Sequence, residues 1–163
     1  LASQGRFADA ERHYRQALAI QHDNDRAHFQ LSIALFSQRE FDTALSHLRE
    51  AINLNPDLPE ALNMMASILA THADPSIRRP QEAIRLGQRA AELTNHQDPL
   101  ILGTLSAAYA SAGQFDQAAA LAETALELAS STEKHRLVLQ LRQQIQSYRQ
   151  AIRKQEVSPE IAP

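Results

Sequence analysis

Histidine is the side chain in this sequence with the widest chemical range, because it can bind a metal or carry a proton near neutral pH. Two histidines four residues apart would place two metal ligands on one face of a helix. None of the seven histidines are paired at that spacing; they stand at positions 13, 22, 28, 47, 72, 96 and 135. His72, Asp74 and His96 are a set that an irregular stretch of chain could bring together. We favour solvated loop residues there over a metal site.

Motifs for covalent catalysis and phosphate binding are absent from the sequence. It contains no glycine-rich phosphate loop, no Gly-x-Ser-x-Gly nucleophile elbow and no His-Glu-x-x-His zinc motif. It also has no cysteine, which excludes disulfides and cysteine-based zinc sites and leaves the compartment open. We therefore predict a protein that is not an enzyme and has no catalytic residues, metal or cofactor.

The overall charge gives little attraction for polyanions. The 163 residues carry a net charge of −3, and no apolar run approaches the roughly 20 residues that cross a bilayer. We predict no nucleic-acid partner and no direct membrane insertion.

The last part of the chain is basic nonetheless. An acidic segment over residues 98–128 is followed by Lys134, Arg136, Arg142, Arg149, Arg153 and Lys154. One interpretation is a contact with an acidic partner or nucleic acid. We favour a solvated face that balances the acidic segment, because nucleic-acid binding usually needs a denser basic stripe.

Pairs of alanines seven residues apart recur along the chain and indicate the elements that position its side chains. Seven residues make two helical turns, so each pair lies on one face where a neighbouring helix can approach closely. Successive pairs follow after 34, 39 and 35 residues: Ala10/Ala17, Ala44/Ala51, Ala83/Ala90 and Ala118/Ala125. A period near 34 with small residues at fixed offsets predicts stacked helix–turn–helix hairpins.

Further residues repeat in the same register, and the combined pattern resembles the tetratricopeptide repeat. The matching positions are Leu31-Ser32, Leu105-Ser106, Tyr109, Gly5, Gly113, Phe7, Phe41, Phe115, the alanine pairs and Pro56. The resemblance covers residues 1 to about 130. It implies an all-α fold, a right-handed α-α superhelix of about three and a half helical hairpins plus a C-terminal capping helix.

The repeat register divides the chain into units. We expect a single array over residues 1–154, with a partial unit at 1–24, full units at 25–58, 59–98 and 99–132, and a capping helix at 132–154. Ser130 and Glu133 form a capping box that would start this last helix. Residues 155–163 are expected to form a disordered tail. The first five residues resemble the turn inside a repeat, so we expect further chain upstream.

Three positions depart from the family pattern. Arg39 replaces a turn glycine, while Gly87 and Ala122 replace the aromatic residue of the second helix. The unit at 59–98 also contains five extra residues with two prolines. We expect this insertion to fold back and lay Ile77 or a proline ring over Gly87.

The resemblance also implies a working surface, because the first helix of each unit lines the concave side of such arrays. The expected groove residues are Arg26, Phe29, Gln30, Ile33, Phe36, Asn63, Met64, Ser67, Thr71, Thr104 and Ala107. An apolar or helical peptide suits the Phe and Met side chains, although Phe29 and Phe36 could equally pack between repeats. Family members that clamp chaperone C-terminal carboxylates use Lys, Arg and Asn at fixed offsets, and carboxylate capture needs the cations among them. At those offsets this chain has no cation; it has Phe29, Ile33, Asn63, Met64, Leu100 and Thr104. A chaperone carboxylate is therefore not the expected partner.

We predict a protein–protein interaction scaffold that binds a peptide or helix of a partner. The alternative is a structural or oligomerisation module of a larger bacterial enzyme, such as a membrane-associated, glycosyltransferase-like one, because the last units resemble the closing repeats of such proteins. We also expect self-association, as a homodimer, through Phe7 and Tyr14 at the N-terminal face.

Overall fold

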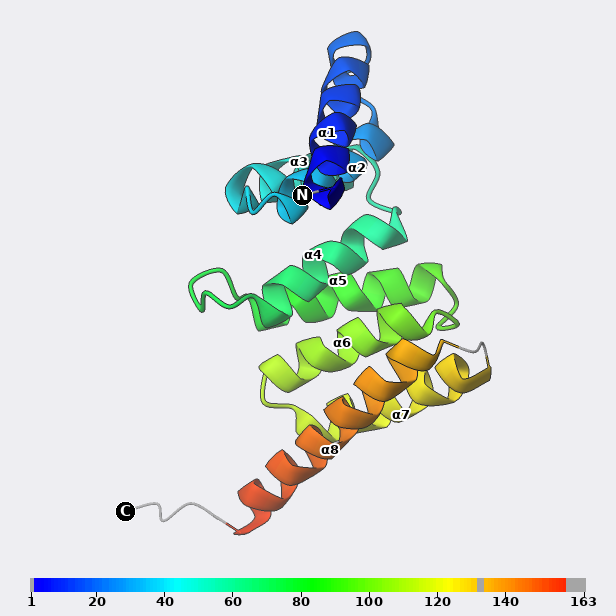
Figure 1. The fold of residues 1–163 in the computed structure, drawn as a ribbon. Helices are drawn as coiled ribbons and strands as arrows, with labels where there is room; N and C mark the ends of the chain where they lie inside the picture. The colour runs from blue at the N-terminus through cyan, green and yellow to red at the C-terminus, as the bar shows by residue number, and fades with distance from the viewer. Residues whose placement is uncertain (1, 132–133, 158–163) are drawn as a thin grey trace. The chain divides into compact units, whose positions relative to one another are not determined.

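The computed structural model describes residues 2–131 and 134–157, with side chains from Phe7 onward. Within these ranges every regular element is an α-helix (Figure 1). The helices are α1 (Ala2–Ile20), α2 (Asp25–Ser37), α3 (Phe41–Leu54), α4 (Pro59–Thr71), α5 (Pro80–Leu93), α6 (Pro99–Ser111), α7 (Phe115–Ser131) and α8 (His135–Val157). The predicted all-α fold class is confirmed. The chain forms two compact units, Leu1–Met65 and Ala66–Pro163.

In the first unit, α1 packs against α2, and α2 packs against α3. The core contains Leu31, Leu35 and Ala44, with Tyr14, Leu18 and Phe36 packed against it. Asn24 begins α2 as its N-cap, since its side chain accepts a hydrogen bond from the Ala27 amide at 2.9 Å. The turn expected over the first five residues is not found, because α1 already begins at Ala2.

In the second unit, α5 packs against α6, α6 against α7, and α7 against α8. The repeated alanines make these close approaches possible, because a methyl group adds little thickness to a helix face. All six alanines of the last three pairs are at most 1% exposed: Ala44 and Ala51 in the first unit, and Ala83, Ala90, Ala118 and Ala125 in the second. This burial is what the seven-residue spacing predicts, whereas Ala10 and Ala17 of the first pair are half-buried.

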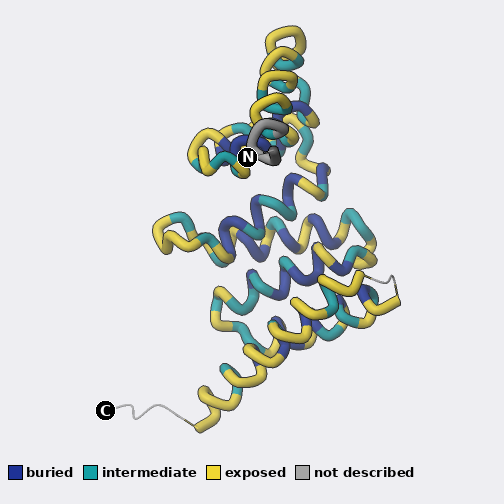
Figure 2. Tube along the Cα trace, in the orientation of Figure 1, coloured by how far each residue is buried: buried dark blue, intermediate teal, exposed yellow. Residues whose placement is uncertain are grey.

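Gly87 has a different neighbour from the one expected. A Cβ atom at this position would lie 3.0 Å from Leu105 Cδ1 and 3.3 Å from Leu105 Cβ, so α6 itself fills the space beside the glycine. The expected cover by Ile77 or a proline ring is therefore wrong. The insertion runs between α4 and α5 with mostly exposed residues, and the Arg79 amide ties its end to the Leu69 carbonyl at 2.9 Å (Figures 1 and 2).

The start of the last helix also differs from the prediction. Ser130 lies inside α7, where its Oγ donates to the Leu126 carbonyl at 2.7 Å, so it does not cap α8. Glu133 lies outside the described residues. Helix α8 begins at His135 and continues to Val157, which makes residues 155–157 of the expected tail helical. Residues 158–163 of that tail lie outside the described residues.

The apolar stripe of α8 is buried as its spacing predicts. Leu141, Ile145 and Tyr148 are at most 7% exposed, and Leu137 and Ile152 are half-buried. The rest of the helix surface is largely exposed (Figure 2). Gly103 on α6 permits the approach of α8, since an added Cβ would lie 3.1 Å from Leu141 Cδ2.

Candidate functional site

The expected groove residues of α2 divide between solvent and the core of the first unit. Arg26 and Gln30 are exposed, while Phe29, Ile33 and Phe36 are half-buried. The Phe36 ring packs edge-on against Phe41, with ring centroids 5.1 Å apart, and also rests on the core. Phe36 therefore serves largely to pack α2, and the open part of this surface consists of the other four residues.

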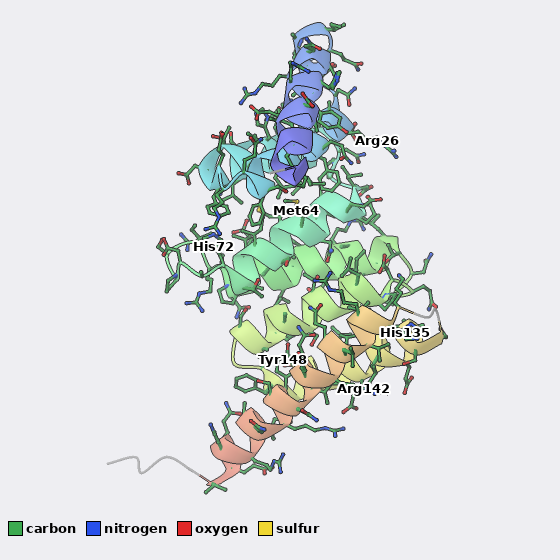
Figure 3. All side chains as sticks on the ribbon, viewed as in Figure 1. Arg26, Met64, His72, His135, Arg142 and Tyr148 are labelled. Atoms are coloured by element: carbon green, nitrogen blue, oxygen red, sulfur yellow. The ribbon has the colours of Figure 1, made fainter. Side chains whose placement is uncertain are left out.

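The groove residues of α4 that belong to the first unit are Asn63 and Met64, both half-buried. Met64 Sδ lies 3.9 Å from Ser32 Oγ on α2, so the thioether contacts the fully buried serine there. Figure 3 labels Met64 and Arg26, which come from the two helices of this surface. Asn63 Oδ1 is buried and has no hydrogen-bond partner among the described residues. A buried amide oxygen without a partner is costly and suits a site that receives a donor.

The second unit brings four of the expected groove residues together around one cavity of about 120 Å³. Its lining residues come from α4, α6 and α8: Ser67, Thr71, Leu100, Gly103, Thr104, Ala107, Leu137, Gln140 and Gln144. We call this space the α4–α6–α8 cavity. The contribution of α8 was missed by sequence reasoning, which treated that helix only as a cap. The three- and four-residue spacing of 137, 140 and 144, beside the apolar stripe, is the signal that could have found it.

The α4–α6–α8 cavity has no charged side chain in its lining. Both threonine hydroxyls donate within their own helices, Thr71 to the Ser67 carbonyl at 2.8 Å and Thr104 to the Leu100 carbonyl at 3.1 Å. Gln144 Oε1 is buried and has no partner among the described residues. The cavity thus offers apolar contacts from Leu100, Ala107 and Leu137 together with one unused acceptor, a combination that suits a neutral group carrying an N–H or O–H donor.

The set His72, Asp74 and His96 does not assemble into a metal site. The Asp74 amide donates to His72 Nδ1 at 3.1 Å, and Asp74 Oδ1 accepts from the Ser76 amide at 2.8 Å, so both side chains shape the insertion. The hydrogen bond from Ser76 lowers the pKa of Asp74. His96 lies in the connection from α5 to α6, with a φ angle of 55°. Among the described residues, no group of three or more His, Asp or Glu side chains could hold a metal ion.

A pair of histidines that sequence reasoning left apart meets in the first unit. His28 Nδ1 on α2 and His47 Nδ1 on α3 are 2.9 Å apart, and His28 Nε2 lies 3.0 Å from the His22 carbonyl oxygen. Since that carbonyl accepts from Nε2–H, His28 Nδ1 accepts a hydrogen bond from His47. Burial, and secondarily the neighbouring His28, lowers the pKa of His47. Their spacing of 19 residues gives no local motif that would reveal the contact.

The two residues expected to mediate self-association, Phe7 and Tyr14, both lie on α1. Phe7 and Tyr14 are both half-buried, and Tyr14 packs on the core of the first unit. A shallow pocket on the outer side of α1 is lined instead by Ala8, Glu11, Arg12, Arg15, Gln16 and Ala19. No helix of the described residues is both long and apolar enough to cross a membrane.

Comparison with known proteins finds relatives of the first part of the chain. The tetratricopeptide repeat model matches residues 1–69. Photosystem I assembly protein Ycf3 of Synechococcus elongatus is 40% identical over 67 residues, and that of Cyanophora paradoxa is 39% identical over 69 residues. The matches cover 39% and 40% of this chain and of the respective relative. The chain thus spans about two fifths of the length of these curated relatives.

Solved structures extend the likeness of fold to nearly the whole chain. A crystal structure of MamA superposes with a TM-score of 0.64 at 20% identity, covering 95% of this chain and 94% of that one. MamA from Desulfovibrio magneticus RS-1 gives 0.66 at 14% identity, with 94% and 90% coverage. Pseudomonas aeruginosa PilF gives 0.62 at 17% identity, with 90% and 71% coverage. With the tetratricopeptide repeat match over residues 1–69, the buried alanines and the helical hairpins, these findings show that the chain has the α-α fold of a tetratricopeptide repeat array.

Proposed function

We propose that this chain is a protein-interaction scaffold that holds a neutral peptide segment of a partner on the first-helix surfaces of its repeats. The observation that carries the proposal is the α4–α6–α8 cavity, with its uncharged lining and its unused Gln144 Oε1. A peptide offers both an apolar side chain that can contact Leu100, Ala107 and Leu137 and a backbone N–H that can donate to Gln144 Oε1. Arg26, Phe29, Gln30, Ile33 and Met64 form a second, more apolar surface in the first unit.

The relatives favour a scaffold over the alternative of a module in a larger enzyme. The matched curated relatives are described as assembly proteins for photosystem I, and the match covers only part of each. We therefore carry over only the general role of a protein that takes part in assembling a complex. The identity of that complex does not follow from the match.

The experiment is selection of short peptides from a randomised display library on the whole chain, followed by affinity measurement on variants. Gln144→Leu removes the acceptor and should weaken the selected peptides about tenfold or more, since a ligand donor would then be buried without a partner. Gln143→Leu is the matched control on the same helix, because Gln143 is exposed. It should leave affinity unchanged.

Measuring the stability of Gln144→Leu shows whether its loss of affinity comes from the binding site or from a damaged fold. Because Gln144 Oε1 is buried without a partner, Gln144→Leu should raise the free energy of unfolding by about 1 kcal/mol. Peptides with a free acidic C-terminus should not be selected by this cavity, as no cation lines it. Selected peptides that bind parent, Gln144→Leu and an Ala107→Phe variant equally well would refute the proposed site.

A further inference from the structure

A second, larger pocket lies where the end of α7 meets the start of α8. Its volume is about 330 Å³, and its lining consists of Ala129, Ser130, His135, Val138, Leu139 and Arg142. We call it the α7–α8 pocket. It shares no residue with the α4–α6–α8 cavity, so it is a separate surface of the second unit.

The lining of the α7–α8 pocket includes three apolar side chains, Ala129, Val138 and Leu139, and the pocket is open to solvent. Leu139 is 61% exposed, and Val138 beside it is half-buried. Neither belongs to the apolar stripe that fixes α8 on its neighbours, because Leu141, Ile145 and Tyr148 perform that task. An apolar side chain of a partner would therefore find contact area here without displacing the core of the unit.

The lining of the pocket also includes the cation Arg142, on a helix that carries several cations and one carboxylate. Residues 134–157 include six Lys and Arg side chains, and the carboxylate among them is Glu156, near the far end of the helix. Arg149 pairs with Glu123 of α7 at 2.6 Å. Among the described residues, no ion pair involves Arg142, which lies at the pocket with His135 (Figure 3). Arg142 is the cation here that remains available to an incoming carboxylate.

We propose that the α7–α8 pocket docks an acidic amphipathic segment of a partner protein. An apolar side chain of the segment packs on Leu139 and Val138, while a carboxylate pairs with Arg142. Charge complementarity identifies the occupant, because α8 presents cations with one distant carboxylate. The exposed leucine favours a protein segment over a nucleic acid, whose backbone would contact cations alone. This proposal does not depend on the peptide site in the other cavity.

The test is selection of short randomised peptides on the whole chain, with counter-selection on a Leu139→Ser/Arg142→Glu double variant. Peptides that distinguish the two targets should be enriched in carboxylates and carry a Leu, Ile, Phe or Met. Their dissociation constants should rise about tenfold or more on Arg142→Glu and should also rise with added salt. Arg136→Glu makes the same charge change outside the pocket lining and should have a much smaller effect.

The Leu139→Ser/Arg142→Glu double variant must fold like the parent for the comparison to be valid. Both substituted residues are exposed, so the double variant should keep the circular dichroism spectrum and melting temperature of the parent. If no peptide distinguishes the parent from the double variant, or if the distinguishing peptides are not enriched in carboxylates, the proposal is wrong. A single-stranded oligonucleotide that binds the parent, loses affinity on Leu139→Ser/Arg142→Glu and displaces the peptides would assign the surface to nucleic acid instead. Peptides that lose affinity for Gln144→Leu but not for Arg142→Glu bind the α4–α6–α8 cavity and count against this proposal. Peptides that lose affinity for Arg142→Glu support it, whatever their affinity for Gln144→Leu.

Discussion

Arg39 and Gly113 occupy corresponding turns, after α2 and after α6, and both have left-handed backbone conformations. Their φ angles are 67° and 77°. Glycine adopts this conformation freely, whereas a residue with a Cβ atom pays about 1–2 kcal/mol for it. Arg39→Gly should therefore raise the free energy of unfolding by about 1 kcal/mol in urea titrations.

The reciprocal substitution is the control for this turn. Gly113→Ala should lower stability by about 1 kcal/mol through backbone conformation alone, because a Cβ there meets no atom within 4 Å. A destabilised Arg39→Gly protein would show that the Arg39 side chain contributes more than its backbone costs.

The burial of His47 beside His28 makes the first unit sensitive to acid. Burial lowers the pKa of His47 in the folded chain below its ordinary value of 6.5. Between the folded and the unfolded pKa of His47, the unfolded state binds more protons than the folded state. The contribution of His47 to stability is therefore fully present above pH 6.5 and is lost as the pH drops through the folded pKa. Unfolding titrations from pH 8 to pH 5 should show this loss, and His47→Phe should flatten it.

Two carboxylates change the stability of the first unit in a separate, more acidic pH range. A hydrogen bond from Gln38 lowers the pKa of Glu11, and one from Asn55 lowers that of Asp25. Their contributions are present above the ordinary values of 4.5 and 3.8 and are lost as the pH falls below them. An unchanged slope between pH 8 and pH 5 in His47→Phe would therefore rule out the histidine pair as its cause.

At the scale of helices, the alanine spacing makes a quantitative prediction about packing. Ala118 is fully buried on α7, and its carbonyl accepts a hydrogen bond from the buried Ser106 Oγ on α6 at 2.8 Å. Ala118→Leu should overpack this crossing and lower the free energy of unfolding by about 1–3 kcal/mol. The measurement is the urea midpoint, with Gln146→Leu as an exposed control that should stay within roughly 0.5 kcal/mol.

Gln38 would be a poor control, although the sequence suggests an exposed side chain. It is half-buried, and its amide donates to Glu11 Oε2 on α1 at 2.8 Å. Equal midpoints for Ala118→Leu and the parent would contradict the repeat register itself.

The elements that sequence patterns predicted are those with a local period. Ala118 and Leu141 follow helical spacing, and both are fully buried. The features that were missed depend on distant segments. Gly87 is matched to Leu105 of the next helix, and Gln144 completes a cavity begun on α4, so neither role has a local signal. Ser130 has the local signal of a cap, but α7 continues past it.

At the scale of the whole molecule, the open question is whether copies of the chain associate. The sequence predicts concentration-dependent dimers through Phe7 and Tyr14. In the structure, Tyr14 packs on the core of the first unit, and the pocket on the outer side of α1 is lined by short and charged side chains. The arginines there are already paired along the helix, Arg12 with Asp9 at 3.0 Å and Arg15 with Glu11 at 2.8 Å.

Because Tyr14 packs on the core of its own unit and both arginines of this pocket are paired along the helix, we expect light scattering to report a monomer across the accessible concentration range. Phe7→Ser should then change stability without changing the measured mass, because a half-buried ring is removed from the unit and not from an interface. Dimers that form with rising concentration and weaken on Phe7→Ser would support the sequence-based expectation instead. They would mean that α1 exposes its aromatic residues to a partner at the expense of packing within its own unit.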